Sequence, residues 1–332
     1  MAGPNDADKQ TSIRAVTGTA LDYNGDWSAL FDAASITAGD FNGRQLAWLN
    51  LRLGSTYTSL PEAQNAYAVA QGFTNWSAMG TFDPVYMAAA VTYFNAMPTQ
   101  PTAQVKGFIS TFIAGLMTDG LWTKIDGGNI LCNNTAGQSY IDFKRPTRVA
   151  TLSGTPTFTS YRGFTGTATL AEYVDTTFVP AVSGVAYLQN SAHIGVWVRN
   201  NIQSAGTAMG VSTGASAYIL PRNLADGFVS RINDATNATV AAVVDSSGFS
   251  SVVRTGASAT QAYKNGAALG AAGSAASTQL PTGTIKYLNT AVGGTSGLHQ
   301  VAFGCYGGGL DATQAANLYS RVNTLVTALT AL

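Results

Sequence analysis

The second half of the chain is built from short β-branched and aromatic runs, separated about every ten residues by turns rich in Gly, Asn, Ser and Thr. Runs of this length and spacing predict an antiparallel β-sandwich or jelly roll. We expect strands at residues 140–143, 148–152, 173–178, 193–199, 217–220, 228–232, 240–244, 249–254, 285–288 and 300–306.

Two local patterns within this half support the interpretation. Residues 193–199 (HIGVWVR) alternate, so three aliphatic side chains share one face of a strand, while Trp197 and its alternate neighbours share the other. Asn265-Gly266 stands between two candidate strands and predicts a type I′ hairpin turn, because both residues tolerate positive φ. Residues 268–277 are nearly all Ala, Gly and Ser, and we expect a loop there.

The region from Asp26 to about residue 125 carries helical patterns. Helix N-terminal signals stand at Asp26, Asp40, Ser59 and Asp83, and Ser59 forms a capping box with Glu62. The clearest apolar stripe recurs at helical spacing and ends at Gly120; it consists of Val105, Phe108, Ile109, Phe112, Ile113, Leu116 and Met117.

A last helix is predicted after Asp311, which forms a capping pattern with Gln314. Its apolar stripe must be covered by the sandwich or by a partner chain. We therefore predict an α+β protein, with a small N-terminal helical domain followed by an antiparallel β-sandwich (jelly roll) with a C-terminal helix. The expected parts are an extended N-terminal assembly arm (1–25), a helical attachment domain (26–126), the jelly-roll β-sandwich (127–309) and the C-terminal helix (310–332), packed on the sandwich or a partner.

Residues 1–25 show no period and many turn-forming residues. We predict that this polar segment is held in order by contact with the body of the protein or with a partner chain. The assembly-contact candidates are Ile13, Arg14, Val16 and Tyr23.

The chain carries few charges. Lys+Arg and Asp+Glu both number 17, and charged residues make up 10% of the chain, against about 25% in an average soluble protein. Without a basic field we expect no nucleic-acid partner, and the interrupted apolar stretches predict no membrane insertion. A surface of hydroxyls and amides suits packing against copies of itself, so we expect a homo-oligomer, with a trimer favoured.

Five segments carry a resemblance to a known group of proteins. They are GLMTDGLWTKID (115–126), PTFTSYRGFTG (156–166), SAHIGVW (191–197), RTGASATQAYKNG (254–266) and GCYGGGLDATQAANLY (304–319). In this order they resemble tailed-bacteriophage virion proteins with a C-terminal concanavalin-like, LamG-type jelly roll.

The resemblance implies a structural, non-enzymatic virion component, such as a tail-fibre, tail-tip or capsid-decoration protein, with other virion proteins as partners. The polar N-terminus lacks the pattern of a signal peptide, so we expect synthesis in the host cytoplasm. The alternative is a carbohydrate-binding adhesin that recognises a host-surface glycan. A third hypothesis is a polysaccharide depolymerase.

The acidic residues of the β region do not form an evident catalytic pair. Glycoside hydrolysis needs two carboxylates that face one cleft. Glu172 and Asp175 are the densest pair, but their odd offset puts them on opposite faces of a strand. Asp226, Asp234 and Asp245 stand beside turns, where we expect them to bind the backbone.

Other chemistry has little support from the residue types present. Cys132 and Cys305 are the two cysteines, and we expect buried free thiols and neither a metal nor a cofactor. The two histidines are His193 and His299, and His193 is expected to be a half-buried histidine on a sheet. The glycine run 304–309 does not match a phosphate-binding motif, so we expect a flexible joint.

Two further groups of residues are candidates for ligand contacts. One is a basic cluster at a turn, which we expect to be solvated or paired with the acidic helical half; it consists of Lys144, Arg145, Arg148 and Arg162. The other is a set of aromatic residues that suit stacking on sugar rings when exposed. These glycan-contact candidates are Trp197, Tyr218, Tyr263 and Tyr287.

Overall fold

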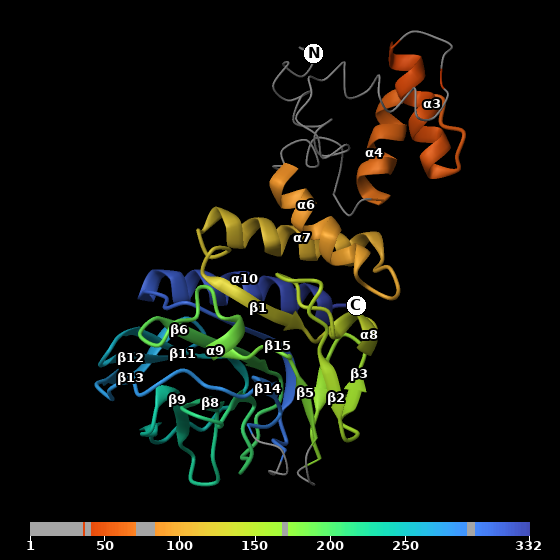
Figure 1. The fold of residues 1–332 in the computed structure, drawn as a ribbon. Coiled ribbons are helices and arrows are strands. Elements are labelled where there is room, and N and C mark those ends of the chain that lie inside the picture. Colours follow the sequence, from red (N-terminus) through yellow and green to blue (C-terminus); the bar gives the residue numbers. More distant parts are fainter. Residues whose placement is uncertain (1–35, 37–40, 71–83, 168–171, 291–295) are drawn as a thin grey trace. The chain divides into compact units, whose positions relative to one another are not determined.

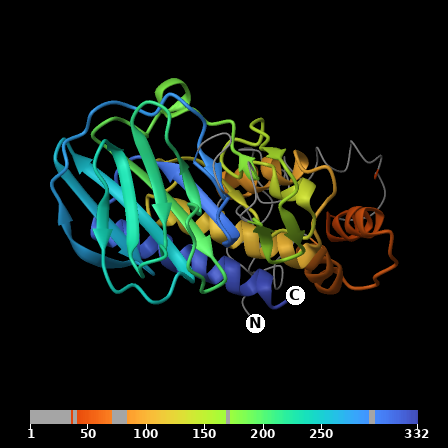
Figure 2. The same ribbon diagram turned by 90° about the horizontal axis from the view of Figure 1, so that it is seen from below.

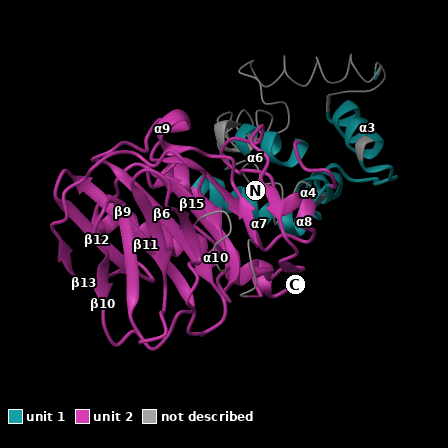
Figure 3. Cartoon of the chain, turned by 60° about the horizontal axis from the view of Figure 1, so that its bottom comes forward, with its two compact units in different colours: residues 1–95, 100–114 teal, residues 96–99, 115–332 magenta. Residues whose placement is uncertain are grey.

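A computed structural model of the chain describes residues 36, 41–70, 84–167, 172–290 and 296–332 (Figure 1). The chain divides into two compact units (Figure 3): residues 1–95 with 100–114 form unit 1, and residues 96–99 with 115–332 form unit 2. The described part of unit 1 is helical, while unit 2 contains all the described strands and the last helix.

The helices of unit 1 follow the predicted starts and ends. The Ser59 hydroxyl accepts a hydrogen bond from the Glu62 backbone N–H at 3.4 Å, as an N-cap residue does. Trp48 and Tyr67 pack with ring centroids 5.4 Å apart. The helix expected after Asp26 lies outside the described residues. The described helices are α3 (Phe41–Leu53), α4 (Leu60–Ala70), α6 (Pro84–Asn95) and α7 (Ala103–Thr118), which runs on into unit 2.

The stripe predicted for α7 is largely buried. Val105, Ile109, Phe112 and Ile113 are all inaccessible or nearly so. Gly120 has φ +69°, a conformation that suits glycine at a helix C-terminus, and the helix ends there as predicted. Among the described helices, none has the length and apolar character needed to span a membrane.

Unit 2 is a sandwich of two antiparallel sheets, which confirms the predicted fold class (Figures 1 and 2). The first sheet has the order β13 (Ala267–Gly273), β12 (Ala259–Lys264), β11 (Gly248–Gly256), β6 (Ala192–Val198), β15 (Gln300–Gly307), β4 (Gly163–Thr165) and β3 (Thr157–Thr159), with β1 (Ile125–Ile130) also paired to β15. The second sheet has the order β10 (Ala238–Val240), β9 (Phe228–Asp234), β8 (Ser216–Leu220), β7 (Met209–Val211), β14 (Lys286–Tyr287), β5 (Tyr173–Asp175) and β2 (Thr151–Ser153). The short helices α8 (Ala136–Ser139) and α9 (Pro180–Ser183) lie in connections.

Strand β6 shows the predicted alternation. Ile194, Val196 and Val198 lie in the core between the two sheets. Trp197 faces the other way, and its ring lies parallel to that of Tyr319. Each face of the first sheet therefore packs against a different layer.

Helix α10 (Ala312–Thr330) covers the outer face of the first sheet (Figures 1 and 2). The predicted capping box is present, with the Asp311 carboxylate accepting from the Gln314 N–H at 2.8 Å. The helix contacts β11, β13 and β15, so the sandwich covers its apolar stripe. Arg321 also pairs with Asp119 at 2.8 and 3.0 Å. The buried residues of α10 are Ala315, Leu318, Val322, Leu325, Val326 and Leu329.

The prediction of a flexible joint at residues 304–309 was wrong. Gly304 and Gly307 belong to strand β15, and both are buried. A Cβ on Gly304 would lie 2.1 Å from Tyr287 Cε1, and one on Gly307 would lie 2.0 Å from the Lys124 carbonyl oxygen. These glycines allow close approach, a use of glycine that differs from flexibility.

Four other strand-level predictions need correction. Residues 268–277 were expected to be a loop, but β13 extends to Gly273. Residues 140–143 form isolated bridges, and only Val240 of residues 240–244 lies in a strand. The sheet also begins at Ile125, before the predicted boundary at 127, because the glycines of β1 let it approach β15: a Cβ on Gly128 would lie 2.4 Å from the Gly304 oxygen. The Asn265-Gly266 turn is confirmed, with φ of 49° and 78°.

Candidate functional site

A pocket of about 570 Å³ lies on the outer side of the first sheet, beside α10. Its walls come from the end of β6, from the start of β11 with the nearby hairpin turn, and from α10. Distant parts of the chain thus converge on one concave surface, as they do in ligand sites. The lining residues are Trp197, Val198, Arg199, Asp245, Ser247, Gly248, Asn265, Tyr319, Val326, Thr327, Thr330 and Ala331.

Two aromatic rings contribute to the apolar part of this pocket, together with Val198, Val326 and Ala331. Trp197 points outward from β6, and Tyr319 lies on the apolar stripe of α10. Their ring planes are 5° from parallel, with centroids 6.3 Å apart. Both side chains are half-buried, so part of each ring is accessible to a ligand.

A polar side faces these rings. Asp245 Oδ1 accepts hydrogen bonds from the Ser247 N–H at 2.8 Å and from the Ser247 hydroxyl at 2.7 Å. Although partial burial raises the pKa of Asp245, the bonds from Ser247 and the nearby cations lower it below its ordinary value, so the carboxylate is ionised at neutral pH. Asn265 Oδ1 accepts from the Phe249 N–H at 2.8 Å, which fixes this amide beside the pocket.

Arg199 completes the lining. It directly follows β6, and its Nη1 group donates to Thr330 Oγ1 of α10 at 2.6 Å. The side chain is half-buried. The pocket thus combines aromatic faces, hydrogen-bonding groups and a guanidinium.

The described carboxylates do not form a pair in the pocket. Asp245 is the one carboxylate among the described residues that line it, whereas most glycoside hydrolases use two. Glu172 accepts from the Thr167 N–H and hydroxyl, both at 2.8 Å. Asp175 lies 3.4 Å from Lys286 Nζ, so this predicted pair is divided between separate partners.

The turn acids have mixed roles. Asp234 and Asp245 accept backbone N–H bonds, as predicted. Asp226 differs, because its carboxylate binds the side chains of Arg222 and Gln203, both at 2.7 Å.

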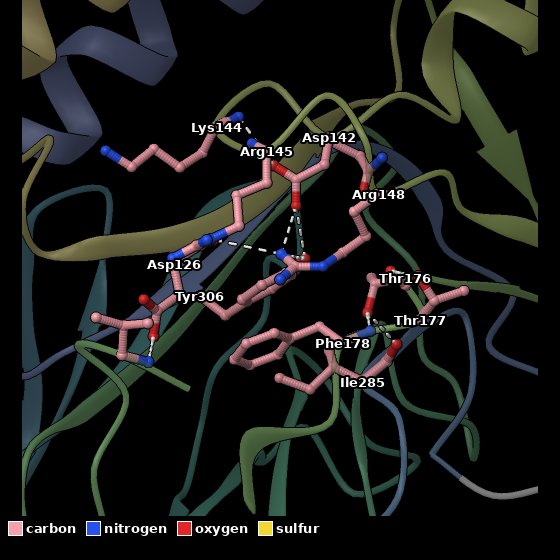
Figure 4. A network of polar contacts seen from close by, with 12 residues as sticks. Asp126, Asp142, Lys144, Arg145, Arg148, Thr176, Thr177, Phe178, Ile285 and Tyr306 are labelled. Atoms are coloured by element: carbon pink, nitrogen blue, oxygen red, sulfur yellow. Dashed lines mark hydrogen bonds and ion pairs between the residues drawn. The ribbon is translucent and has the colours of Figure 1, made fainter. Parts of the chain in front are cut away.

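Two members of the predicted basic cluster, Arg148 and Lys144, belong to a structural network (Figure 4). The other two, Arg145 and Arg162, are exposed, as expected of solvated residues. Arg148 Nη1 donates to Asp142 Oδ2 at 2.9 Å, and the Tyr306 hydroxyl donates to the same oxygen at 3.0 Å. The guanidinium also lies over the Phe178 ring, 4.9 Å from its centroid. Lys144 Nζ donates to the Trp122 carbonyl at 2.8 Å. These two cations therefore pair within unit 2 and are not left to a solvated loop.

Asp126 anchors the same region. Its carboxylate accepts backbone N–H bonds from Val185, Ala186 and Tyr187 at 2.7–3.0 Å. Three successive N–H groups make an anion-binding concavity, and here the protein's own carboxylate fills it. The bond ties β1 to the connection that leads into β6.

Both histidines and both cysteines are buried. His193 Nδ1 lies 2.6 Å from the Gly308 carbonyl, and its Nε2 lies 3.9 Å from Cys305 Sγ. The expected half-burial of His193 was an underestimate, since its exposure is 0%. Cys132 and Cys305 are free and buried, as predicted. The described residues hold no group of three or more His, Cys, Asp and Glu side chains suited to a metal.

The structure separates the four aromatic glycan-contact candidates. Trp197 lines the pocket, whereas Tyr218 lies on β8 of the second sheet. Tyr287 and Tyr263 are buried, with exposures of 0% and 7%, so neither ring can stack on a sugar from solvent. Tyr287 was misplaced because β14 points it into the core. The assembly-contact candidates Ile13, Arg14, Val16 and Tyr23 lie outside the described residues.

Sequence reasoning missed Tyr319, Arg199 and Asn265 as members of one site. A usable signal existed for the first. The sequence placed Trp197 on the strand face opposite the aliphatic side chains. It also placed Tyr319 on the apolar stripe of the last helix, which was expected to be covered by the sandwich or by a partner chain. The alternation of residues 193–199 places Arg199 on the same strand face as Trp197, whereas Asn265 carried only a turn signal.

Comparisons with known proteins add little to this geometry. No protein-family model and no curated protein matches the chain. Among solved structures, Trypanosoma rangeli sialidase in complex with 2,3-difluorosialic acid matches with a TM-score of 0.43 and 9% identity, over 60% of this chain and 33% of that one. The chain thus spans about a third of the sialidase's length.

Two other solved structures are similar at the same level. Domain 4 of an extracellular arabinanase from Geobacillus stearothermophilus, in complex with arabinotriose, matches with a TM-score of 0.38 and 15% identity, over 59% of this chain and 98% of that one. The botulinum neurotoxin serotype D binding domain matches with a TM-score of 0.41 and 9% identity, over 60% and 52%. TM-scores this low do not assign the chain to the family of any of these proteins.

Proposed function

We propose that this protein is a non-enzymatic carbohydrate-binding protein whose sandwich holds a sugar in the pocket of Trp197 and Tyr319. The supporting observation is the convergence of two accessible parallel rings with Asp245, Asn265 and Arg199 on one concave surface. Aromatic faces cover the apolar C–H faces of a sugar ring, and the polar groups bond its hydroxyls. Binding without hydrolysis is supported by the described lining residues, which include one carboxylate where most glycoside hydrolases use two.

Binding to a glycan array, followed by calorimetry on the best ligand, tests this proposal. Trp197→Ala removes a central aromatic contact, so we expect a loss of about 2 kcal/mol, or roughly thirtyfold in Kd. Tyr218→Ala is the matched control, because Tyr218 is also half-buried but lies outside the pocket. Loss of binding in Tyr218→Ala with full binding in Trp197→Ala would contradict the proposed site.

A structural role in a tailed-bacteriophage virion is our second proposal, and the sequence resemblance over five segments supports it. In that setting the protein is a tail-fibre, tail-tip or capsid-decoration component, and the sandwich presents its pocket to a host surface. Deleting residues 1–20 should leave the sandwich folded and abolish incorporation into particles. Unchanged occupancy of particles by the deletion variant would refute the role given to the arm.

The depolymerase hypothesis is tested separately. Purified protein should leave the viscosity of a bound polysaccharide unchanged. A fall in viscosity that Asp245→Asn abolishes would show that the protein is an enzyme.

A further inference from the structure

The pocket contains a cation that its own walls do not neutralise. Arg199 donates to a neutral hydroxyl, Thr330 Oγ1, and no carboxylate of the described residues lies within 4.0 Å of its guanidinium. Four of the other arginines of unit 2 differ in this respect, since each of these four has a carboxylate oxygen within 2.9 Å. The pairs are Arg148–Asp142, Arg222–Asp226, Arg254–Asp234 and Arg321–Asp119.

The charged groups around Arg199 increase this imbalance. Burial lowers the pKa of Arg199, and the positive charge of Arg162 lowers it further. The acidic group that acts on the pKa of Arg199 is the Cys132 thiol. Burial raises the pKa of that thiol to about 12, so the thiol is neutral at physiological pH. None of the side chains that act on the pKa of Arg199 therefore supplies a negative charge that compensates it.

Asp245 lines the same pocket but does not neutralise Arg199. The cations that act on the pKa of Asp245 are Lys264 and Arg222, and Arg199 is not among them. Asp245 is absent in turn from the groups that act on Arg199. The pocket thus has an anionic acceptor suited to sugar hydroxyls in one place and an unpaired cation in another.

Resting on the carbohydrate-binding function proposed above, we infer that the pocket selects an acidic sugar, whose carboxylate pairs with Arg199 while its ring lies against Trp197. A planar guanidinium matches a carboxylate in a two-point, charge-assisted geometry, which an ammonium group does not. A half-buried cation without a partner gains more from an anion than one that is already paired. Asp245 and Asn265 then accept or donate bonds to the hydroxyls of the same sugar.

The test uses matched acid and ester ligands on the full chain. The probes are oligosaccharides that end in glucuronate, galacturonate, mannuronate or N-acetylneuraminate, each paired with its own carboxyl methyl ester, and dextran sulfate. We expect at least one acid to bind about tenfold more tightly than its ester, the low end of what a charge-assisted bond contributes. The glucuronate, galacturonate and mannuronate probes test for a hexuronic acid, and the N-acetylneuraminate probe tests for a nine-carbon acidic sugar.

Variants locate the effect. Arg199→Gln should reduce binding of the preferred acid to the level of its ester. Arg145→Gln is the matched control, because Arg145 is exposed and does not line the pocket. Thr330→Val removes the hydrogen bond to Arg199 but keeps its charge, so the preference for the acid should remain. Thermal melts identify any variant that fails to fold, and in that case Arg199→Lys, expected to keep only part of the preference, replaces Arg199→Gln.

Several results would overturn the inference. The inference is wrong if every acid binds as tightly as its ester, or if the acid preference survives Arg199→Gln. It is also wrong if dextran sulfate binds and none of the carboxylated probes does. If neutral glycans bind in a Trp197-dependent way without any acid preference, the inference fails while the proposed function stands. If no glycan binds at all, both fail.

Discussion

Mild acid will destabilise the sandwich through its two histidines. Burial lowers the pKa of both His193 and His299 from 6.5 to about 4. Between pH 6.5 and about pH 4 the unfolded chain therefore binds protons on these histidines, while the folded protein does not. The contribution of the neutral histidines to the free energy of unfolding is complete above pH 6.5 and falls as the pH drops through this window. A pH of 5 lies about 1.5 units below the pKa of each imidazole in the unfolded chain, so each histidine lowers the free energy of unfolding by about 2 kcal/mol.

The geometry at His193 explains why its imidazole does not bind a second proton in the folded state. Its Nδ1 group meets the Gly308 carbonyl at 2.6 Å and is the donor there. A second proton on Nε2 would face the Cys305 thiol at 3.9 Å, in a site without solvent. The imidazole is therefore held neutral.

Urea unfolding at pH 7.5 and pH 5.0 measures the effect. We expect the free energy of unfolding to fall by about 4 kcal/mol for the two histidines together. His193→Gln and His299→Gln will each lower stability at every pH, but each should halve the difference between the two pH values. A difference that both substitutions leave unchanged would refute the reasoning, because carboxylates would then have to account for it.

Three further predictions follow from buried contacts and from composition. Arg254→Leu should lower the free energy of unfolding by about 3–5 kcal/mol, because it leaves the Asp234 carboxylate, 2.8 Å away, buried and unpaired; adding Asp234→Leu should restore part of the loss in urea titrations. Gly304→Ala should cost at least about 1–3 kcal/mol in the same assay, since its Cβ would meet Tyr287. Light scattering after size exclusion should give an oligomer, and a stable monomer at high concentration would contradict this.

Strand β6 and helix α10 were predictable because each carries its own pattern. Alternation in residues 193–199 is a property of neighbours in sequence, so the inward side of β6 followed directly. The cap at Asp311 and the stripe after it are equally local. Patterns of this kind also located α7 and the hairpin at Asn265-Gly266.

The pocket was not predictable in the same way. Arg199, Asn265 and Tyr319 belong to different elements, and only the register of the sheet and the position of α10 bring them together. The alternation places Arg199 on the face of Trp197, but that no carboxylate of the described residues pairs with it is a tertiary property. Tyr287 shows the converse, because a strand of two residues gives no alternation from which its inward direction could be inferred.

Glycine was the main source of error in the strands. A glycine-rich run in sequence suggests mobility, yet in β15 the same residues let a tyrosine ring and a neighbouring backbone come close. The Ala and Gly residues of β13 have low strand propensity, so pairing with β12 overrides a local preference. The strand propensity of a segment does not predict which other strand will pair with it.

The alternation along β6 has a consequence for how this protein can change. Val196 and Val198 hold the sheets together, and Trp197 between them serves the pocket. Most positions that line the pocket thus differ from those that fill the core of the sandwich, although Val198 and Val326 both line the pocket and are buried. Under the proposed function, substitutions at the exposed lining positions could exchange one bound sugar for another, generation after generation, while the interior of the sandwich stays unchanged.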